Sequence, residues 1–282
     1  MTLRALTFGE ALIDEFEDRR IVAGAPLHVA AHLAALGWGA ALVSRVGDDE
    51  DGRWLQATLE EHGVDTRHLE TDPTLPTGTV TVGLDDRGVP AFTVHGPVAW
   101  DVIEGPDPVP AHDALCFGTL PMRDARSRAA LERLLASSTG LRAGDANLRD
   151  PHWDEGAVRL LVTRSDLLKV SDTELPIVSR VMGTTGDPAD LTLLGPEWVC
   201  VTRGRDGASL HHRSGTSWEV TGHDVEVVDT VGAGDAFLAG IVDGIVRSLP
   251  PTEALGKAAE LAVSVVQQRG GLPEPNTAGP AS

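Results

Sequence analysis

The segment at residues 225–240 constrains the fold of this chain more than any other. A run rich in β-branched residues, 225–228, leads into a turn with Gly232 and Gly234 and then into a run of small residues. This order predicts a strand, a tight turn and a helix. Glycines let a backbone approach a ligand closely, and the first turn of a helix offers unpaired N–H groups to an anion. The segment therefore predicts an α/β fold with an anion-binding turn.

Asp235 follows that turn directly. A carboxylate at a phosphate site would repel its ligand unless it had a chemical task, and the natural task is to accept the proton of a hydroxyl that attacks a phosphoryl group. A dinucleotide-binding turn would instead need a third glycine, where this chain has Phe237. The segment thus favours phosphoryl transfer over an ordinary glycine-rich turn.

Composition excludes several classes of partner. The net charge is −19, and the chain has just two lysines, Lys169 and Lys257, which argues against binding to nucleic acid or to an anionic membrane. Cys116 and Cys200 lie in apolar, strand-like runs, where a thiol behaves as a small buried hydrophobe and forms no disulfide framework. No apolar run resembles a membrane span or a signal peptide, so we expect a cytoplasmic protein.

Most of the chain alternates predicted strands with predicted helices, which indicates a largely parallel sheet covered by helices on both faces. Strands are predicted at residues 3–13, 40–46, 114–118, 167–170, 198–202 and 225–228, and helices at 27–36, 52–62 and 127–136. Ligands of such sheets bind at the carboxyl ends of the strands. Residues at predicted strand ends are therefore expected on one rim, among them Asp14, Gly24, Asn147, Ser171, Thr202 and Asp235.

Residues 77–100 break this alternation, because two segments with a period of two flank a turn at 85–88. They predict a β-hairpin. With the strand-like residues near 14–23, the hairpin would form a small β lid that excludes water from the rim. We expect one α/β domain over residues 1–273 and a disordered tail at 274–282.

Several segments resemble the ribokinase-like (PfkB) sugar kinases, in the family's order, over residues 6–273. The turn matches the family's D-T-x-G-A-G-D signature. Further matches are GEALID at residues 9–14, AGAPLHVA at 23–30, RVGDDEDG at 45–52, GDANLR at 144–149, KVSDTEL at 169–175 and VTRGRDGA at 201–208. The resemblance implies a ribokinase-like fold and transfer of the γ-phosphoryl group of ATP to a primary hydroxyl of a sugar.

The resemblance also implies a role for each matched residue. The expected catalytic residues are Asp235 as base, the anion hole at Gly232, Ala233 and Gly234, and Arg149 on the phosphate. The expected sugar-binding residues are Asp14, Gly24, Ala25, His28 and Asn147. The expected nucleotide-binding residues are Thr202, Gly204, Gly207 and Thr230. Glu174 keeps an acidic position associated with Mg²⁺, which it could meet through water, and the resemblance allows a K⁺ site at Asp229.

The chain departs from the family pattern at two sugar-binding positions. Ala23 replaces a glycine, and His28 stands where many fructokinase-like members have asparagine. Histidine can also donate and accept hydrogen bonds, but its ring is larger and its charge titrates. His28 and His32 are four residues apart, which would suit a metal pair, but no third ligand lies at a recognisable spacing.

The motifs look most similar to those of fructokinases, so fructose is the expected acceptor. A 2-keto-3-deoxygluconate kinase is the nearest alternative, and its acidic substrate would want an arginine near the lid, for which Arg87 is the candidate. A nucleoside kinase would need an aromatic stacking surface, and the lid offers Phe92. Lids in this family often pair between subunits, which makes a homodimer an expectation. A catalytically idle sugar-binding regulator on the same fold also stays open, although the retained Asp235 weighs against it.

Overall fold

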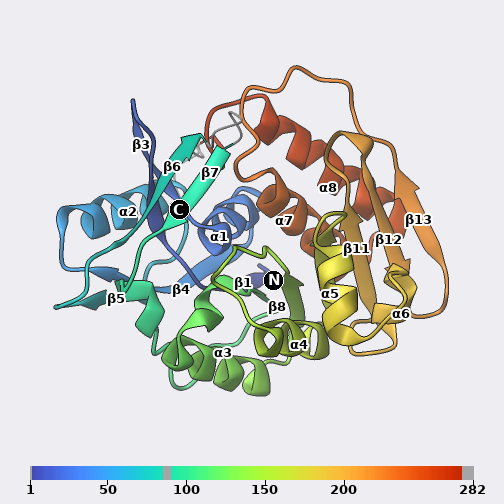
Figure 1. The fold of residues 1–282 in the computed structure, drawn as a ribbon, viewed down its shortest axis with the longest axis horizontal. Helices are drawn as coiled ribbons and strands as arrows, with labels where there is room; N and C mark the ends of the chain where they lie inside the picture. Colours follow the sequence, from blue (N-terminus) through green and yellow to red (C-terminus); the bar gives the residue numbers. More distant parts are fainter. Residues whose placement is uncertain (1, 85–89, 275–282) are drawn as a thin grey trace.

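The computed structural model describes residues 2–84 and 90–274 (Figure 1). Its centre is a nine-stranded sheet of order β13-β12-β11-β10-β9-β8-β1-β4-β5. Strands β11 to β5 in that order run parallel, and the hairpin of β12 and β13 adds an antiparallel edge. The strands are β1 (Arg4–Phe8), β4 (Gly39–Gly47), β5 (Leu69–Asp72), β8 (Ala114–Gly118), β9 (Leu141–Asp145), β10 (Leu167–Ser171), β11 (Trp198–Thr202), β12 (Ala208–His212) and β13 (Ser217–Val220). The expected mostly parallel sheet is confirmed.

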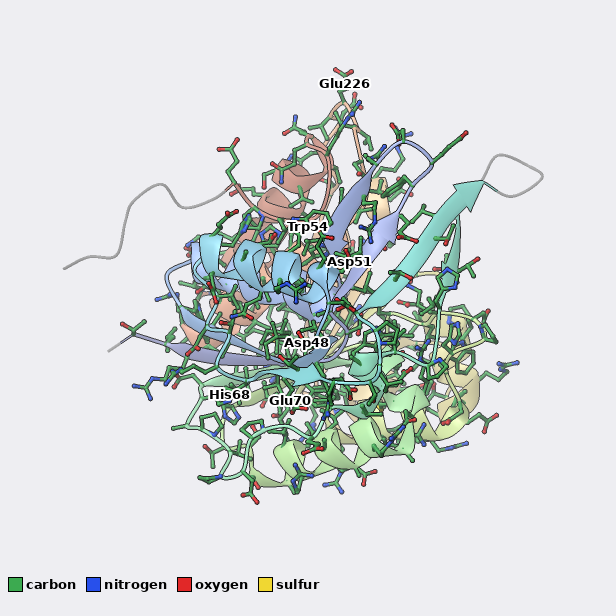
Figure 2. All side chains as sticks on the ribbon, turned by 90° about the vertical axis from the view of Figure 1, so that its left-hand side faces the viewer. Asp48, Asp51, Trp54, His68, Glu70 and Glu226 are labelled. Carbon is green, nitrogen blue, oxygen red and sulfur yellow. The ribbon has the colours of Figure 1, made fainter. Side chains whose placement is uncertain are left out.

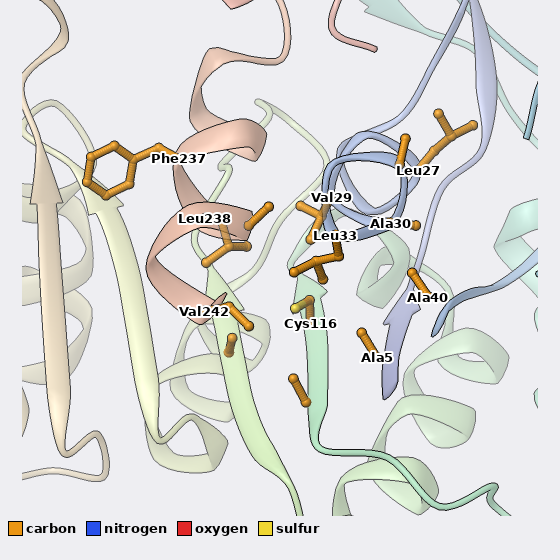
Figure 3. Close-up of a cluster of buried hydrophobic side chains, with 14 of the residues drawn as sticks. Ala5, Leu27, Val29, Ala30, Leu33, Ala40, Cys116, Phe237, Leu238 and Val242 are labelled. Atoms are coloured by element: carbon orange, nitrogen blue, oxygen red, sulfur yellow. The ribbon is translucent and has the colours of Figure 1, made fainter. Parts of the chain in front are cut away.

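Helices cover both faces of this sheet, as the strand-helix alternation predicts. Helices α1 (Ala25–Ala35), α2 (Glu50–Glu61), α7 (Ala233–Val246) and α8 (Pro251–Val266) share one hydrophobic cluster with the sheet, and Figure 3 shows α1 and α7 packed on its strands. Helices α3 (Ala125–Ser137), α4 (Glu155–Arg164), α5 (Leu175–Met182) and α6 (Pro188–Thr192) share a second cluster with the opposite face. Burial of strands on both faces fits their continuous apolar runs.

The lid is a separate four-stranded sheet of order β3-β2-β6-β7. Its strands are β2 (Leu12–Glu15), β3 (Arg20–Ala23), β6 (Gly78–Leu84) and β7 (Pro90–Val94). The two predicted lid segments thus form one sheet. Helix α2 supports it, because Arg20 on β3 pairs with Asp51 on α2 at 2.6 Å, and Figure 2 shows Asp51 beside the lid strands. Arg87 and the side chain of Phe92 lie outside the described residues.

The single strand predicted at residues 3–13 is wrong. Gly9, with a φ of 146°, separates β1 in the central sheet from β2 in the lid. A side chain at Gly9 would press on Pro26 and Pro121, at 3.1 and 3.2 Å from its Cβ. Apolar, buried residues lie on both sides of the break, Phe8 before it and Ala11 to Ile13 after it, and the local signs of the break are Gly9 and the charged Glu10. Asp14 consequently lies in the lid, and not at the end of a central strand.

The strand predicted at residues 225–228 is also wrong. These residues form a loop in which Val227 and Val228 are 56% and 53% exposed. The N–H of Val228 donates to the carbonyl of Val266 at 2.8 Å, at the end of α8. The β-branched run therefore crosses a helix end without joining the sheet, and Asp235 is reached from this loop. None of the strands predicted for the central sheet corresponds to β5, β9, β12 or β13.

Residues 267–274 follow α8 as a non-helical segment that we call the C-terminal strap. His62 at the end of α2 contacts the carbonyl of Pro273 at 3.1 Å, and the amide of Gln268 donates to the carbonyl of Leu272 at 2.7 Å. The expected disordered tail lies outside the described residues beyond Glu274. Within residues 2–84 and 90–274, no helix is both long enough and apolar enough to cross a membrane.

Candidate functional site

A cavity of about 390 Å³ lies between the carboxyl ends of the central strands and the lid. The lid contributes an apolar side from β2, β3, β6 and β7, and the rim contributes charged and glycine residues. Among the predicted site residues, the cavity brings together Asp14, Gly24, Ala25, His28, Asn147, Arg149, Glu174, Thr202, Thr230, Gly232, Gly234 and Asp235. Residues that are far apart in the sequence thus share one site, as expected for the rim of a parallel sheet.

The anion-binding turn begins α7. Gly232 is the N-cap residue with a φ of 78°, a left-handed conformation that favours glycine. The Cβ of a larger residue there would collide with the backbone of Gly271 in the C-terminal strap. Asp229 joins the same two segments, because its carboxylate accepts the N–H of Val231 at 3.0 Å and the N–H of Gly270 at 3.2 Å. The strap therefore fixes the turn from behind and leaves the helix start facing the cavity.

Asp235 lies in the first turn of α7 with its side chain 14% exposed. One carboxylate oxygen, Oδ2, is 2.8 Å from Nδ1 of His28 on α1. The side chain of His28 is 3% exposed, so the contact is shielded from bulk water. The predicted base and the residue that departs from the family pattern are therefore direct neighbours.

Two further carboxyl groups, which the sequence analysis does not assign, line the cavity. Glu10 is 3% exposed, and burial together with the nearby charge of Asp235 raises its pKa to about 7, although the N–H of Ala25, which donates to Glu10 Oε1 at 3.3 Å, opposes this shift. Asp145 is also buried. The available signal for Glu10 is a charged residue within an apolar run, directly after Gly9.

Asp14 reaches the cavity from the lid strand β2. Its burial raises the pKa to about 6, although the nearby side chains of His28 and Arg149 oppose that shift. Gly24 faces it from the start of α1 with a φ of 134°, and a Cβ there would collide with the carbonyl of Glu10. The carboxyl group and the close backbone approach together offer hydrogen-bonding groups to a small polar molecule.

Lys169 is the principal residue that sequence reasoning missed. It lies on β10 directly beside Asp145 on β9, and its Nζ is 2.9 and 2.8 Å from the two carboxylate oxygens. Its Nζ would be 3.2 Å from a Cβ at Gly234, so a buried cation underlies the anion-binding turn. Burial lowers the pKa of Lys169, but Asp145, Glu174 and Asp235 outweigh burial and raise the pKa above its usual value. A lysine in an otherwise apolar strand is the available sequence signal.

Glu174 connects the ends of two strands. Its Oε1 accepts the N–H of Leu148 at 2.8 Å, and its Oε2 accepts the N–H and the hydroxyl of Ser171, both at 2.8 Å. Asn147, directly before Leu148, has a φ of 37°. Within the described part of the chain, no group of three or more His, Cys, Asp or Glu side chains is arranged to hold a metal ion. Glu174 thus orders the loop that carries Asn147 and Arg149.

The two histidines four residues apart do not form a metal pair. His28 contacts Asp235, whereas Nε2 of His32 is 2.9 Å from the carbonyl oxygen of Gly271. Burial lowers the pKa of His32 to about 4, so its neutral ring donates the Nε2–H to that carbonyl. Both rings therefore have structural partners.

A second cavity of about 660 Å³ adjoins the first across Ser171, Thr202, Thr230 and Gly234. Gly204 and Gly207 line it, and so does Ala233. Its apolar wall comes from residues that are not predicted as site residues: Val225, Val227, Phe237, Ala259, Ala262, Val263 and Val266. A polar turn beside an apolar slot suits a ligand with phosphates at one end and a flat base at the other.

Comparisons with known proteins agree with this geometry. A family model described as pfkB family carbohydrate kinase matches residues 3–277. A fructokinase of Escherichia coli is 32% identical over 265 residues, which cover 87% of this chain and 85% of that protein. The crystal structure of a fructokinase from Vibrio cholerae, with fructose, ADP and calcium ion bound, superposes with a TM-score of 0.83 at 27% identity, over 96% of this chain and 95% of that one.

A third relative has its nucleotide in place. The crystal structure of an uncharacterised sugar kinase of Pyrococcus horikoshii in complex with ATP has a TM-score of 0.83 at 26% identity, and the match covers 95% of this chain and 93% of that one. A double mutant of the Vibrio cholerae protein has also been solved with fructose, ADP and potassium ion, at a TM-score of 0.85 and 26% identity over 96% and 94% of the two chains.

Proposed function

Because the chain belongs to the pfkB family of carbohydrate kinases, we propose that it is a fructokinase, which transfers the γ-phosphoryl group of ATP to a primary hydroxyl of fructose. The family and its relatives make the chain a phosphotransferase with an alcohol acceptor. The acceptor sugar, the bound ions and the roles of individual residues are what we propose beyond this class of enzyme.

The observation that carries the proposal is the position of Asp235. It stands where the two cavities meet, one residue after Gly234, which lines both. A sugar in the smaller cavity would face the carboxylate, and a nucleotide in the larger one would place its phosphates on the first turn of α7. Asp235 would accept the proton of the attacking hydroxyl, while Lys169, Arg149 and the helix start offset charge on the transferred group.

The charge of the acceptor cavity supports a neutral sugar. Five carboxyl groups line it, from Glu10, Asp14, Asp145, Glu174 and Asp235, against the cations Arg149 and Lys169. Lys169 is already paired with Asp145. An acceptor with its own carboxylate, such as 2-keto-3-deoxygluconate, would meet repulsion in such a site. The hydroxyls of a neutral ketohexose can instead donate to these carboxylates.

The walls of the cavity also favour a sugar over a nucleoside. Among the described residues that line it, the apolar ones are aliphatic, and His28 supplies the sole aromatic ring. Among these described lining residues, a nucleoside base would find no phenyl or indole surface on which to stack. Fructose, which has no planar base, requires none.

A divalent ion fits this site through a single carboxylate. Oε2 of Glu174 accepts two hydrogen bonds from Ser171 and Oε1 accepts one from Leu148, so Oε1 retains one lone pair for a further ligand. Mg²⁺ usually keeps several waters and binds substrate phosphates with few protein ligands, so Glu174 would hold a hydrated ion. Bound there with ATP, the ion supplies positive charge to the phosphate oxygens.

We also propose that K⁺ binds at the loop that contains Asp229. The carboxylate of Asp229 is partly exposed and accepts two backbone N–H groups, which leaves lone pairs for a weakly held monovalent ion. A relative solved with fructose, ADP and potassium ion supports a role for K⁺. Activity in KCl above that in choline chloride at equal ionic strength would bear it out.

We propose a homodimer from the family resemblance, and the lid gives no further argument for it. The lid has four strands and rests on α2, so the marginal stability of an isolated two-stranded ribbon is no argument for pairing. Sedimentation at several protein concentrations tests it.

A cytoplasmic location, where ATP is available, agrees with two cysteines that are buried and free.

A coupled ADP-release assay tests the proposed acceptor. Fructose, other ketohexoses, ribose, 2-keto-3-deoxygluconate and adenosine are compared at equal concentration with ATP and Mg²⁺, with the D235N variant as the blank. We expect the highest kcat/KM with fructose. Greater turnover of another member would reassign the acceptor, and the same mechanism would then apply to that sugar.

A further inference from the structure

His28 is a buried histidine that touches the proposed base and little else of polar character. Its Nδ1 is 2.8 Å from Oδ2 of Asp235, and its Nε2 is buried without a hydrogen-bond partner among the described residues. A carboxylate can only accept a hydrogen bond, so the hydrogen must lie on Nδ1. A neutral His28 ring is therefore held in the Nδ1–H tautomer, with a bare Nε2.

The C-terminal strap fixes this ring in place. A Cβ at Gly271 would lie 2.6 to 2.8 Å from three atoms of the His28 ring, so only glycine at position 271 leaves room for it. His32 holds the carbonyl of Gly271 at 2.9 Å, and Asp229 holds the N–H of Gly270 at 3.2 Å. The strap thus packs a glycine against the imidazole, and the ring in turn holds the carboxylate.

Titratable groups from several elements lie near His28. Asp235 on α7, Asp14 on β2 and Glu10 before β2 line the same cavity, His32 follows on α1 itself, and the C-terminal strap contributes Gly271. His32 stays neutral because burial lowers its pKa to about 4. Of the side chains named here, His28 is the one that is hydrogen-bonded to Asp235.

We propose that His28 is a positioning residue that holds Oδ2 of Asp235 and leaves Oδ1 for the acceptor hydroxyl. This rests on the proposed function. In the transfer, the hydroxyl oxygen bonds to the γ-phosphorus, the bond from that phosphorus to the ADP oxygen breaks, and ADP leaves with the electron pair. The hydroxyl proton goes to Asp235, and His28 keeps its Nδ1 proton throughout.

Two substitutions separate the parts of this proposal. In H28N, the amide nitrogen is attached at Cγ, as Nδ1 is in histidine, so the donor to Asp235 is retained without a titrating group. In H28A both are lost. H112N is the matched control, because His112 is a partly buried histidine at the opposite end of the sheet, bonded to Ser138 at 2.7 Å.

The kinetic readout is kcat and KM for fructose at pH 8. We expect H28A to lose about 10- to 100-fold, mainly in kcat, as a misplaced base predicts. H28N should recover most of that loss, because it keeps the donor to Asp235. H112N should match the wild type. A wild-type kcat in H28A, or an H28N variant as slow as H28A, would overturn the proposal.

A second readout needs no activity. Nitrogen-15 NMR of histidine-labelled protein, with the His28 signals assigned by their loss in H28N, reports the tautomer of the ring. We expect Nδ1–H in the wild type and a shift toward Nε2–H in D235A, which removes the acceptor. An Nε2–H tautomer in the wild type would refute the contact itself. If no sugar is phosphorylated but the Nδ1–H signal depends on Asp235, the proposed function fails while the His28 contact stands.

Discussion

Lys169 and Asp145 form a buried ion pair across neighbouring parallel strands, directly beneath the turn that begins α7. Both side chains are 7% exposed. Breaking such a pair is costly, because one charge then stays buried without a partner. The pair thus links the stability of the rim to the charge available at the proposed phosphate site.

Substitution of Lys169 tests this link. K169M removes the cation and leaves Asp145 buried, so we expect a loss of about 3 to 5 kcal/mol in the free energy of unfolding and a loss of about 100-fold or more in kcat. The double variant K169M/D145N, with no buried charge, should regain most of the stability in urea unfolding but none of the activity. Recovery of activity in the double variant would assign Lys169 a purely structural role.

Glu174 is expected to govern the response to Mg²⁺. E174Q keeps the size of the side chain but loses its charge and one of its acceptors for Leu148 and Ser171. We expect the Mg²⁺ concentration for half-maximal activity to rise about 10-fold or more, by analogy with outer-shell ligands. Titration of Mg²⁺ at saturating ATP and fructose measures it. An unchanged Mg²⁺ dependence would remove Glu174 from the ion site.

Glu10 should make stability fall as the pH rises. Its pKa is raised by burial from 4.5 to about 7, so the folded state binds the proton more tightly than the unfolded state. Between those two values stability decreases with pH, by roughly 3 kcal/mol in total. E10Q removes this dependence. In urea unfolding, the free energy of unfolding of E10Q should therefore exceed that of the wild type by more at pH 8 than at pH 5. An equal difference at the two pH values would contradict the raised pKa of Glu10.

Val263 tests the larger cavity as the nucleotide site. It lines the apolar wall from α8, and V263W would fill the slot proposed for the base. We expect the KM for ATP to rise about 10-fold or more, in line with loss of a buried apolar contact and its space, with fructose affinity unchanged. E260W, with the same bulk on an exposed position of α8, is the control. A nucleotide KM that rises equally in both variants would speak against the slot.

Much of the fold follows from local sequence patterns, and the site follows less fully. Most of the parallel strands and the turn at Gly232–Asp235 are signalled by apolar runs and by glycines, but β5 and β9 are not. The pairing of Lys169 with Asp145 has no such signal. It depends on the register of two strands, and the two residues are 24 apart in the chain. The contact of His28 with Asp235 joins residues 207 apart, and no local pattern reports it.

The two wrong strands have a common cause. Residues 3–13 are largely apolar and residues 225–228 are rich in valine, so both compositions fit a strand, yet their placement is decided by tertiary contacts. Gly9 turns the first run into the lid, and the end of α8 receives the second. The predicted residues Thr202, Gly204, Gly207 and Thr230 line the larger cavity, but most of its apolar wall comes from α8 and this loop, which carry no motif and are not predicted as part of a site.

The most direct test of the central claim is turnover and fructose binding by D235N. The substitution keeps the shape of the side chain and a carbonyl acceptor for His28 but removes the base. We predict a loss of kcat of about 100-fold or more, with fructose still bound at near wild-type affinity in calorimetry. A D235N enzyme that retains near-full turnover would contradict the assignment of Asp235 as the group that accepts the hydroxyl proton.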